Sequence, residues 1–423
     1  MDTLKRGVIN LLWATIERGL TRVVQAAVML VFARVTDPEA VGIYNWVALG
    51  YTLYHAIAEI AIRSQAVLCL NNAEDLAYIQ HAARRARLFG ALLLGSILGA
   101  LAFLYPERHA IVLGLIPFVL VPALTTAHIV PSATLQYHER WRVLARSQAQ
   151  AAAIAFAVSL PIAILAKSSL AMAAHVTVTE LSYYLLTRRA ASPLHTPLTN
   201  ADRRPPRETF NLMSITVITW GQNQLERVLI GAFAGAAALG TYSTAATIGR
   251  SGGDALGQAA ANYVLARSAT TEDEGRDRLM WRIGVASMAG AVALAAIVYL
   301  AVRFAFAPFL GPKYETSLAV APFFAVASIP AVVSSALQVF GVAQQRSRIA
   351  VISATVGLCF AAPIAWATTI SFTTAVYLVI AKEIAVLGVF ALMRRDRTSW
   401  QLLLASTSAG MLTCLTLVLL TRG

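Results

Sequence analysis

Runs of about 20 mostly apolar residues recur along the whole chain and are separated by short polar segments. Each run can cross a hydrocarbon core of about 30 Å as a helix. Because a segment in lipid must satisfy its own backbone hydrogen bonds, the runs predict helices rather than an open sheet. The predicted spans are residues 7–33, 40–62, 88–104, 110–136, 147–166, 168–187, 208–233, 239–266, 283–302, 315–343, 349–367, 370–393 and 401–420. The predicted fold class is an all-α polytopic membrane protein with about 12–13 transmembrane helices.

Composition supports this reading, since 58% of the residues are hydrophobic and only 13% are charged. In a typical soluble domain about a quarter of all residues are charged. The first apolar run is too long for a signal-peptide core, contains charges and lacks a small-residue cleavage site, so we expect a retained span.

The net charge of +13 would raise the question of nucleic acid in a soluble protein. Here the lysines and arginines are concentrated on one side of the predicted spans. Of the 34, 23 fall in segments on the side of the N-terminus and six in segments on the opposite side. By the positive-inside rule, the N-terminus of this multi-pass protein is predicted to be cytoplasmic. The basicity is therefore topological, and no nucleic acid partner is expected.

One segment near the middle of the chain, AASPLHTPLTNADRRPPRET, is polar, basic and rich in proline. It reads as a linker between two lobes. We predict a six-helix N-terminal lobe over 1–189, a cytoplasmic linker over 190–207, and a C-terminal lobe over 208–423 with six helices and an extra C-terminal span.

The two lobes begin alike. Residues 33–48 align without gaps on residues 231–246 at a constant offset of 198. The identical pairs are Ala40 and Ala238, Gly42 and Gly240, Tyr44 and Tyr242, and Ala48 and Ala246. A parallel repeat predicts a pseudo-twofold axis along the membrane normal, as in many transporters. Chance similarity between alanine-rich helices is the alternative.

Charged residues inside predicted spans point to a polar interior. Glu17, Arg18 and Arg22 lie in the first span, where three uncompensated charges would cost roughly 8 to 10 kcal/mol in lipid. Polar residues also recur at helical spacing on spans two, seven and eight, at Asn45, Thr52, His55, Glu59 and Arg63; Trp220, Asn223 and Arg227; and Ser243, Thr247, Arg250, Asp254, Gln258 and Asn262. These are the first two helices of each lobe, so we expect them to line a central cavity.

The arginines of these helices predict an anion-binding cavity, because guanidinium groups are permanently charged and offer forked donors to phosphate. The predicted substrate-cavity residues are Arg18, Arg22, Arg227, Arg250, Gln25, Asn223 and Gln258. Glu17, Glu59 and Asp254 are candidates for ion coupling. The alternative is that these charges only neutralise one another and hold helices together. Glu180 and the adjacent Lys382 and Glu383 are expected to be structural.

No motif for catalysis, a cofactor or a metal is found. Zinc-protease, nucleophile-elbow and Walker signatures are absent from the sequence, and all seven histidines precede residue 196 without metal-ligand spacing. A membrane enzyme such as a polymerase or ligase is disfavoured because the predicted outer segments are too short to build a catalytic site. A purely structural scaffold would not need the polar stripes.

The segments LLWATIERGLTRVVQAAVMLVFARVTDPEAVGIYNW and QLERVLIGAFAGAAALGTYSTAATI resemble polysaccharide flippases of the multidrug/oligosaccharidyl-lipid/polysaccharide exporter superfamily. The resemblance implies two six-helix bundles around a cationic cavity lined by the first two helices of each lobe. It also implies alternating access in the bacterial inner (cytoplasmic) membrane. The cargo implied is undecaprenyl-diphosphate-linked oligosaccharide, moved outward for surface polysaccharide such as O-antigen, lipopolysaccharide or exopolysaccharide. Expected partners are this lipid-linked substrate, membrane lipid and other polysaccharide-assembly proteins.

A multidrug cation antiporter on the same fold is the main alternative. Organic cations would favour an acidic and aromatic cavity, whereas the predicted cavity is rich in arginine. The basic segment 71–87 reads either as a contact for a partner enzyme or as a solvated face.

Overall fold

A computed structural model describes residues 24–70, 73–194, 206–268, 273–343, 347–394 and 396–422. For some of them, including 206–215 and Gln258, only the backbone is described. Within these ranges the regular structure is entirely helical. Nine helices of the described residues are long and apolar enough to cross a membrane, and a shorter apolar helix covers Val24–Val35. The predicted all-α polytopic fold is therefore confirmed. Glu17, Arg18 and Arg22 lie outside the described residues.

Large apolar side chains cover much of the protein surface. Phe103 is 85% exposed, Leu165 is 83% exposed and Trp366 is 68% exposed. A water-soluble protein avoids apolar patches on this scale, because each would drive aggregation. In a bilayer the same side chains face hydrocarbon, so the surface fits a multi-pass membrane protein.

The chain divides into two compact units whose boundary lies between Trp220 and Gly221. Of the described residues, those up to Trp220 form what we call the N-terminal unit, and those from Gly221 onwards form the C-terminal unit. The predicted lobe limits at residues 189 and 208 stay a prediction, as does the pseudo-twofold axis.

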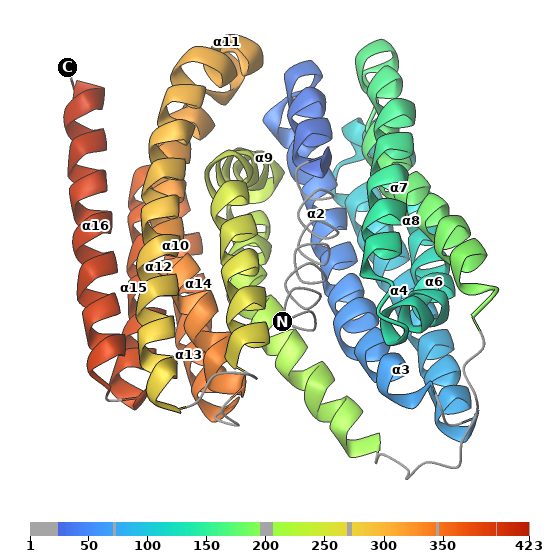
Figure 1. Cartoon of the computed structure of the whole chain (residues 1–423). Helices are drawn as coiled ribbons and strands as arrows, with labels where there is room; N and C mark the ends of the chain where they lie inside the picture. The colour runs from blue at the N-terminus through green and yellow to red at the C-terminus, as the bar shows by residue number, and fades with distance from the viewer. Residues whose placement is uncertain are drawn as a thin grey trace. The chain divides into compact units, whose positions relative to one another are not determined.

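The N-terminal unit is a helical bundle, drawn in blue to green in Figure 1. In it α8 packs against α7 and α6, while α4 packs against α2 and α6. Its elements are α2 (Pro38–His55), η1 (Ala56–Ile62), α3 (Arg63–Cys69), α4 (Ala73–Leu104), η2 (Pro106–Arg108), α5 (His109–Gly114), η3 (Ile116–Leu120), α6 (Val121–Tyr137), α7 (Trp141–Pro161), η4 (Ile162–Ala166) and α8 (Leu170–Ala191).

The C-terminal unit is built around α12 (Glu315–Ala343), which packs against α10, α15 and α16. A largely apolar helix belongs in a core, and 83% of the residues in an apolar 18-residue stretch within Pro312–Gln338 are buried. The other elements, yellow to red in Figure 1, are α10 (Asp273–Ala301), η5 (Val302–Phe306), α11 (Ala307–Leu310), η6 (Pro312–Tyr314), α13 (Ser347–Cys359), α14 (Ala361–Ile370), α15 (Phe372–Arg394) and α16 (Arg397–Arg422).

The helix labelled α9 (Pro206–Ser268) contains two predicted spans joined by a turn at Gly235. Gly235 has a φ of 84°, which a residue with a side chain rarely adopts. The aligned position in the first lobe is Asp37, whose side chain accepts a hydrogen bond from the Ala40 N–H and so caps α2. The two aligned blocks therefore make their turns in different ways: the first uses an aspartate cap, and the second uses a glycine with positive φ.

Three predicted elements differ in detail from the structure. The segment 71–87 is not separate, because α4 starts at Ala73 and runs without a break into the predicted span 88–104. The span predicted at 110–136 is divided into α5, η3 and α6, where Pro117 and Pro122 remove backbone donors. The span predicted at 349–367 is divided between α13 and α14 at Phe360.

Candidate functional site

In the N-terminal unit, a short π-helix places a carboxylate inside the bundle. Residues of α2 continue directly into η1, which carries Glu59, and η1 continues into α3, which starts with Arg63. A π-helix changes the direction in which the following side chains point, and such segments are frequent at functional sites. The Arg63 guanidinium donates to Glu59 Oε2 at 2.6 Å.

Glu59 is the first member of a chain of buried polar groups that reaches α8. His128 on α6 has its Nδ1 3.5 Å from Glu59 Oε1 and its Nε2 2.8 Å from Glu180 Oε2. The hydroxyl groups of Thr125 and Tyr51 donate to the Glu180 carboxylate at 3.1 Å and 3.0 Å. We call Glu59, Arg63, His128 and Glu180 the N-terminal charge cluster.

Charge balance in this cluster depends on a proton. Two carboxylates face one arginine, and the imidazole lies between the carboxylates. The cluster is neutral when His128 carries a proton on each ring nitrogen and has one excess negative charge when His128 is neutral. An uncompensated charge buried in a membrane is costly, so the cluster is suited to hold one cation.

The C-terminal unit has a second buried cluster, centred on Lys382 of α15. The Lys382 ammonium is 2.7 Å from Glu226 Oε2 and 3.6 Å from Glu383 Oε1. The Tyr242 hydroxyl donates to the other Glu226 oxygen at 2.7 Å. Lys382, Glu226 and Glu383 are almost fully buried, so each charge depends on its partners for stabilisation.

Arg250 extends this cluster towards a more open position. Its Nη2 lies 3.0 Å from Glu383 Oε1, and its Nε lies 3.8 Å from Asp254 Oδ1. The Asp254 side chain is 46% exposed, whereas that of Arg250 is 13% exposed. We call Glu226, Arg250, Asp254, Lys382 and Glu383 the C-terminal charge cluster. Its charges alternate in sign from the exposed Asp254 to the buried Glu226.

The predicted site residues fall into three groups. Arg250 and Asp254 are brought together, and Glu59 is joined to Arg63 and His128 within one unit. Asn223 is exposed and Arg227 is half-buried, while the half-buried Gln25 interacts with the Tyr44 side chain. Glu17, Arg18, Arg22 and the side chain of Gln258 lie outside the described residues. Whether the described residues line a substrate cavity stays a prediction.

Two further predicted stripe residues meet in the N-terminal unit. The indole N–H of Trp220 donates to the Thr52 hydroxyl at 3.1 Å, which joins α9 to α2. Thr52, on the polar face of α2, is therefore bonded to a residue 168 positions away in the sequence.

Sequence reasoning gave His128, Glu180, Lys382 and Glu383 no functional role. Each is an ionisable residue within an otherwise apolar span, and such residues mark ion or substrate pathways by default. That signal was present at all four positions. It carried little weight because none of them belongs to a polar stripe.

Within the described part of the chain, no group of three or more His, Cys, Asp or Glu side chains has the arrangement that holds a metal ion.

The comparisons with known proteins identify the family. The family model described as "Polysaccharide biosynthesis protein" matches residues 31–282. No curated protein sequence matches the chain. The predicted resemblance is confirmed by this match and by the folds of solved structures.

The structural relatives are transporters and flippases. A structure titled "Lipid II flippase MurJ, inward closed conformation" superposes with a TM-score of 0.62 at 11% identity over 96% of this chain and 97% of that chain. "Crystal structure of MATE in the straight conformation" superposes with a TM-score of 0.60 at 13% identity over 96% and 97%. For "Crystal structure of eukaryotic MATE transporter AtDTX14" the TM-score is 0.55 at 14% identity over 97% and 99%.

At these identities the structural matches establish the fold. The polysaccharide family model covers more than half of the chain. The chain therefore belongs to the polysaccharide biosynthesis protein family, and its fold is the one found in structures titled as a lipid II flippase and as MATE transporters.

Proposed function

We propose that this protein moves undecaprenyl-diphosphate-linked oligosaccharide across the bacterial inner membrane by alternating access, for the synthesis of a surface polysaccharide. The observation that carries the proposal is the polysaccharide-family match over residues 31–282, on a fold shared with a structure titled as a lipid II flippase. Membership of this family favours a glycan-bearing substrate over a drug.

The chemistry of the described arginines supports an anionic substrate. Arg227 is half-buried, and its Nε lies buried without a hydrogen-bond partner among the described residues. Arg250 is held by Glu383 at 3.0 Å but has only a long contact with Asp254. Each guanidinium carries five N–H donors, more than these contacts use, and a diphosphate accepts forked hydrogen bonds from such groups.

Ion coupling through Glu17, Glu59 or Asp254 is part of the proposal. Of the two that the structure describes, Glu59 has the closer contacts, because its carboxylate meets both Arg63 and His128. Loss of the proton that balances this cluster would leave a buried negative charge and bias the N-terminal unit towards another packing. Either a proton or a sodium gradient can supply the balancing cation.

The direct test is translocation by the purified protein. Vesicles containing the protein are loaded with an undecaprenyl-diphosphate-linked oligosaccharide whose sugar carries a fluorophore, and a membrane-impermeant quencher reports its transfer between leaflets. We expect transfer by the wild type and a rate roughly tenfold lower for Arg227→Gln, the order expected from loss of one charged hydrogen bond.

The matched control is Arg348→Gln, which removes the same charge from an exposed helical position in the same unit. Equal transfer with and without protein would contradict the proposal. Equal rates for Arg227→Gln and Arg348→Gln would remove Arg227 from the substrate site.

The second candidate function is multidrug antiport. The observation that favours it is the likeness to two MATE structures, with TM-scores of 0.60 and 0.55. Uptake of a fluorescent organic cation into the same vesicles, driven by a pH or sodium gradient, would identify this function. The flippase proposal predicts no such uptake.

A further inference from the structure

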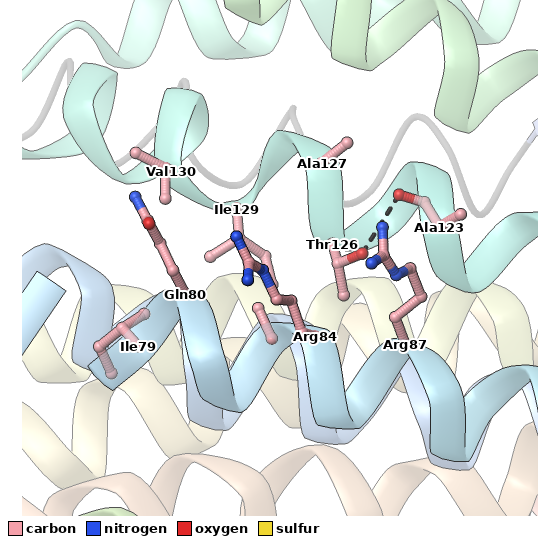
Figure 2. Close-up of a pocket in the computed structure, with 10 residues that line it drawn as sticks. Ile79, Gln80, Arg84, Arg87, Ala123, Thr126, Ala127, Ile129 and Val130 are labelled. Atoms are coloured by element: carbon pink, nitrogen blue, oxygen red, sulfur yellow. Dashed lines mark hydrogen bonds between the residues drawn. The ribbon is translucent and has the colours of Figure 1, made fainter. Parts of the chain in front are cut away.

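A groove lined by two arginines lies between α4 and α6 of the N-terminal unit (Figure 2). Gln80, Arg84 and Arg87 project from α4 towards α6, which contributes Thr126 to the opposite wall. The Thr126 hydroxyl donates to backbone carbonyls of its own helix, at Pro122 and Ala123, so it stays free to accept a further hydrogen bond. The groove has a volume of about 190 Å³.

The lining of this groove is basic. Among the described residues that form it there is no aspartate or glutamate, and the side chains of Arg84, Arg87 and Gln80 are exposed. Two guanidinium groups one helical turn apart present a concentrated set of donors and two fixed positive charges. The natural complement is a phosphate group, which accepts forked hydrogen bonds.

The position of the arginines along α4 indicates where this phosphate belongs. They directly precede the run from Leu88 to Tyr105, which contains no charged residue. Leu88 and Leu92 are 63% and 62% exposed and follow Arg84 at intervals of four residues, on the same side of the helix. The charged end of the groove therefore lies at the depth of lipid headgroups, and an apolar strip leads from it along the helix.

The C-terminal unit carries a second groove of the same kind. It has a volume of about 440 Å³ and lies between α10 and α16, where Arg278, Trp281 and Arg282 face Thr398 and Gln401. The arginines again precede an uncharged run, residues 283–302. Trp281 is 38% exposed at the same level, as is common for tryptophan at a membrane interface. Each unit thus pairs two arginines with a threonine and a glutamine.

We infer that both grooves are binding sites for the phosphate headgroup of an anionic phospholipid, whose acyl chains lie along the adjacent apolar helix faces. Basic pockets between transmembrane helices are suited to such headgroups. A free phosphate ion would gain nothing from the exposed leucines next to Arg84, whereas a phospholipid covers them. This inference does not depend on which substrate the protein carries.

The test is lipid binding to the purified full chain, measured by native mass spectrometry. The protein in an uncharged detergent is titrated with phosphatidylglycerol or with phosphatidylcholine that has the same acyl chains. We expect preferential retention of two phosphatidylglycerol molecules. Arg84→Gln with Arg87→Gln should remove one of them, and Arg278→Gln with Arg282→Gln the other, with about fivefold weaker binding for each arginine lost.

The control is Arg85→Gln, an exposed position on α4 that does not line the groove, and it should retain both lipids. Arg84→Lys with Arg87→Lys keeps the charge and should keep most of the preference, so loss of binding through misfolding is recognised. Equal binding of the two lipids, or no effect of the paired variants beyond that of Arg85→Gln, would overturn the inference. Displacement by inorganic phosphate alone, or by undecaprenyl diphosphate in preference to phosphatidylglycerol, would also overturn it.

Discussion

At the scale of single residues, Lys382 has the most demanding environment in the C-terminal unit. It is buried between Glu226 and Glu383, and its ammonium group is 2.7 Å from the Glu226 carboxylate. Replacing two buried partners with apolar groups is often tolerated, but removing one partner leaves the other charge uncompensated. The stability of the unit therefore depends on the pair remaining complete.

This gives a first prediction. Lys382→Met should lower the free energy of unfolding by about 3–5 kcal/mol, because Glu226 loses its only ion-pair partner among the described residues. Unfolding in a detergent titration measures the change. Lys313→Met removes an exposed charge of the same unit, and the loss of an exposed charge should cost only about 1 kcal/mol or less. Combining Glu226→Gln with Lys382→Met should recover part of the loss. Equal stability of Lys382→Met and Lys313→Met would contradict the prediction.

Asp396 gives a second prediction, outside the membrane-spanning helices. Its carboxylate accepts a hydrogen bond from the Ser399 N–H at 2.6 Å and lies 2.5 Å from Arg394 Nε. Burial raises the pKa of this carboxyl, but the bonds from Ser399 and the charge of Arg394 outweigh it, so the pKa lies below its ordinary value of 3.8. Because the folded state prefers the ionised form, this contribution is present above pH 3.8 and is lost as the pH falls through the folded-state pKa.

Asp396→Asn should therefore cost about 0.3–1 kcal/mol at neutral pH, where the negative charge at the start of α16 is lost although an asparagine cap is retained. The difference in melting temperature between variant and wild type should vanish in acid below the folded-state pKa. A difference that is constant with pH would show that the carboxylate charge does not contribute.

All residues of the two charge clusters except Arg63, which directly follows the span predicted at 40–62, could be located in predicted spans. Their partners on other helices could not be predicted. His128 and Glu180 are 52 residues apart, and Lys382 and Glu226 are 156 residues apart. Helical periodicity relates residues on one helix, whereas these pairs depend on how separate helices pack. For the same reason, Glu180, Lys382 and Glu383 were expected to be merely structural, and that expectation has not been tested.

At the scale of elements, the close packing of α9 on α12 depends on glycine. A Cβ atom at Gly249 would lie 2.3 Å from the Ala321 carbonyl oxygen, and one at Gly253 would lie 2.3 Å from Ser328 Cβ. The contact at Gly249 is with backbone, which cannot move aside as a side chain can. Small residues therefore let these two helices approach each other, as is common in membranes.

Gly249→Ala should force the helices apart and cost about 1–3 kcal/mol. The matched control is Gly388→Ala in α15, where a Cβ meets no atom within 4 Å. That substitution should instead stabilise the helix by about 0.5–1 kcal/mol, because alanine loses less conformational entropy than glycine. Thermal unfolding of the two variants should move in opposite directions; a shared direction would contradict this account of the α9–α12 contact.

The existence and approximate limits of the helices could be read from apolar run length, since the bilayer sets a fixed length for each span. Their internal breaks were harder to predict. The turn at Gly235 falls within an expected loop, but the π-helix Ala56–Ile62 has no recognisable sequence signal and it decides where Glu59 lies. A face assigned by regular helical spacing loses its register at such a segment.

At the scale of the whole molecule, the two charge clusters lie within separate compact units, and each is a row of charged side chains of alternating sign. The N-terminal charge cluster runs from η1 through α6 to α8, and the C-terminal charge cluster joins α9 to α15. Glu180 and Lys382 each lie eleven residues after a serine that immediately precedes their helix, Ser169 and Ser371. At the same distance from the helix start, α8 thus carries a negative charge and α15 a positive one.

The measurement that tests the central claim most directly is made in the host cell. The gene is deleted, and mass spectrometry quantifies undecaprenyl-diphosphate-linked oligosaccharide and finished surface polysaccharide, before and after restoring wild type or the double variant Arg18→Gln, Arg250→Gln at matched expression. A flippase predicts accumulation of complete lipid-linked repeat units and loss of polymer, with rescue by wild type alone. Unchanged levels of both, in a strain without a second flippase, would contradict the proposed function.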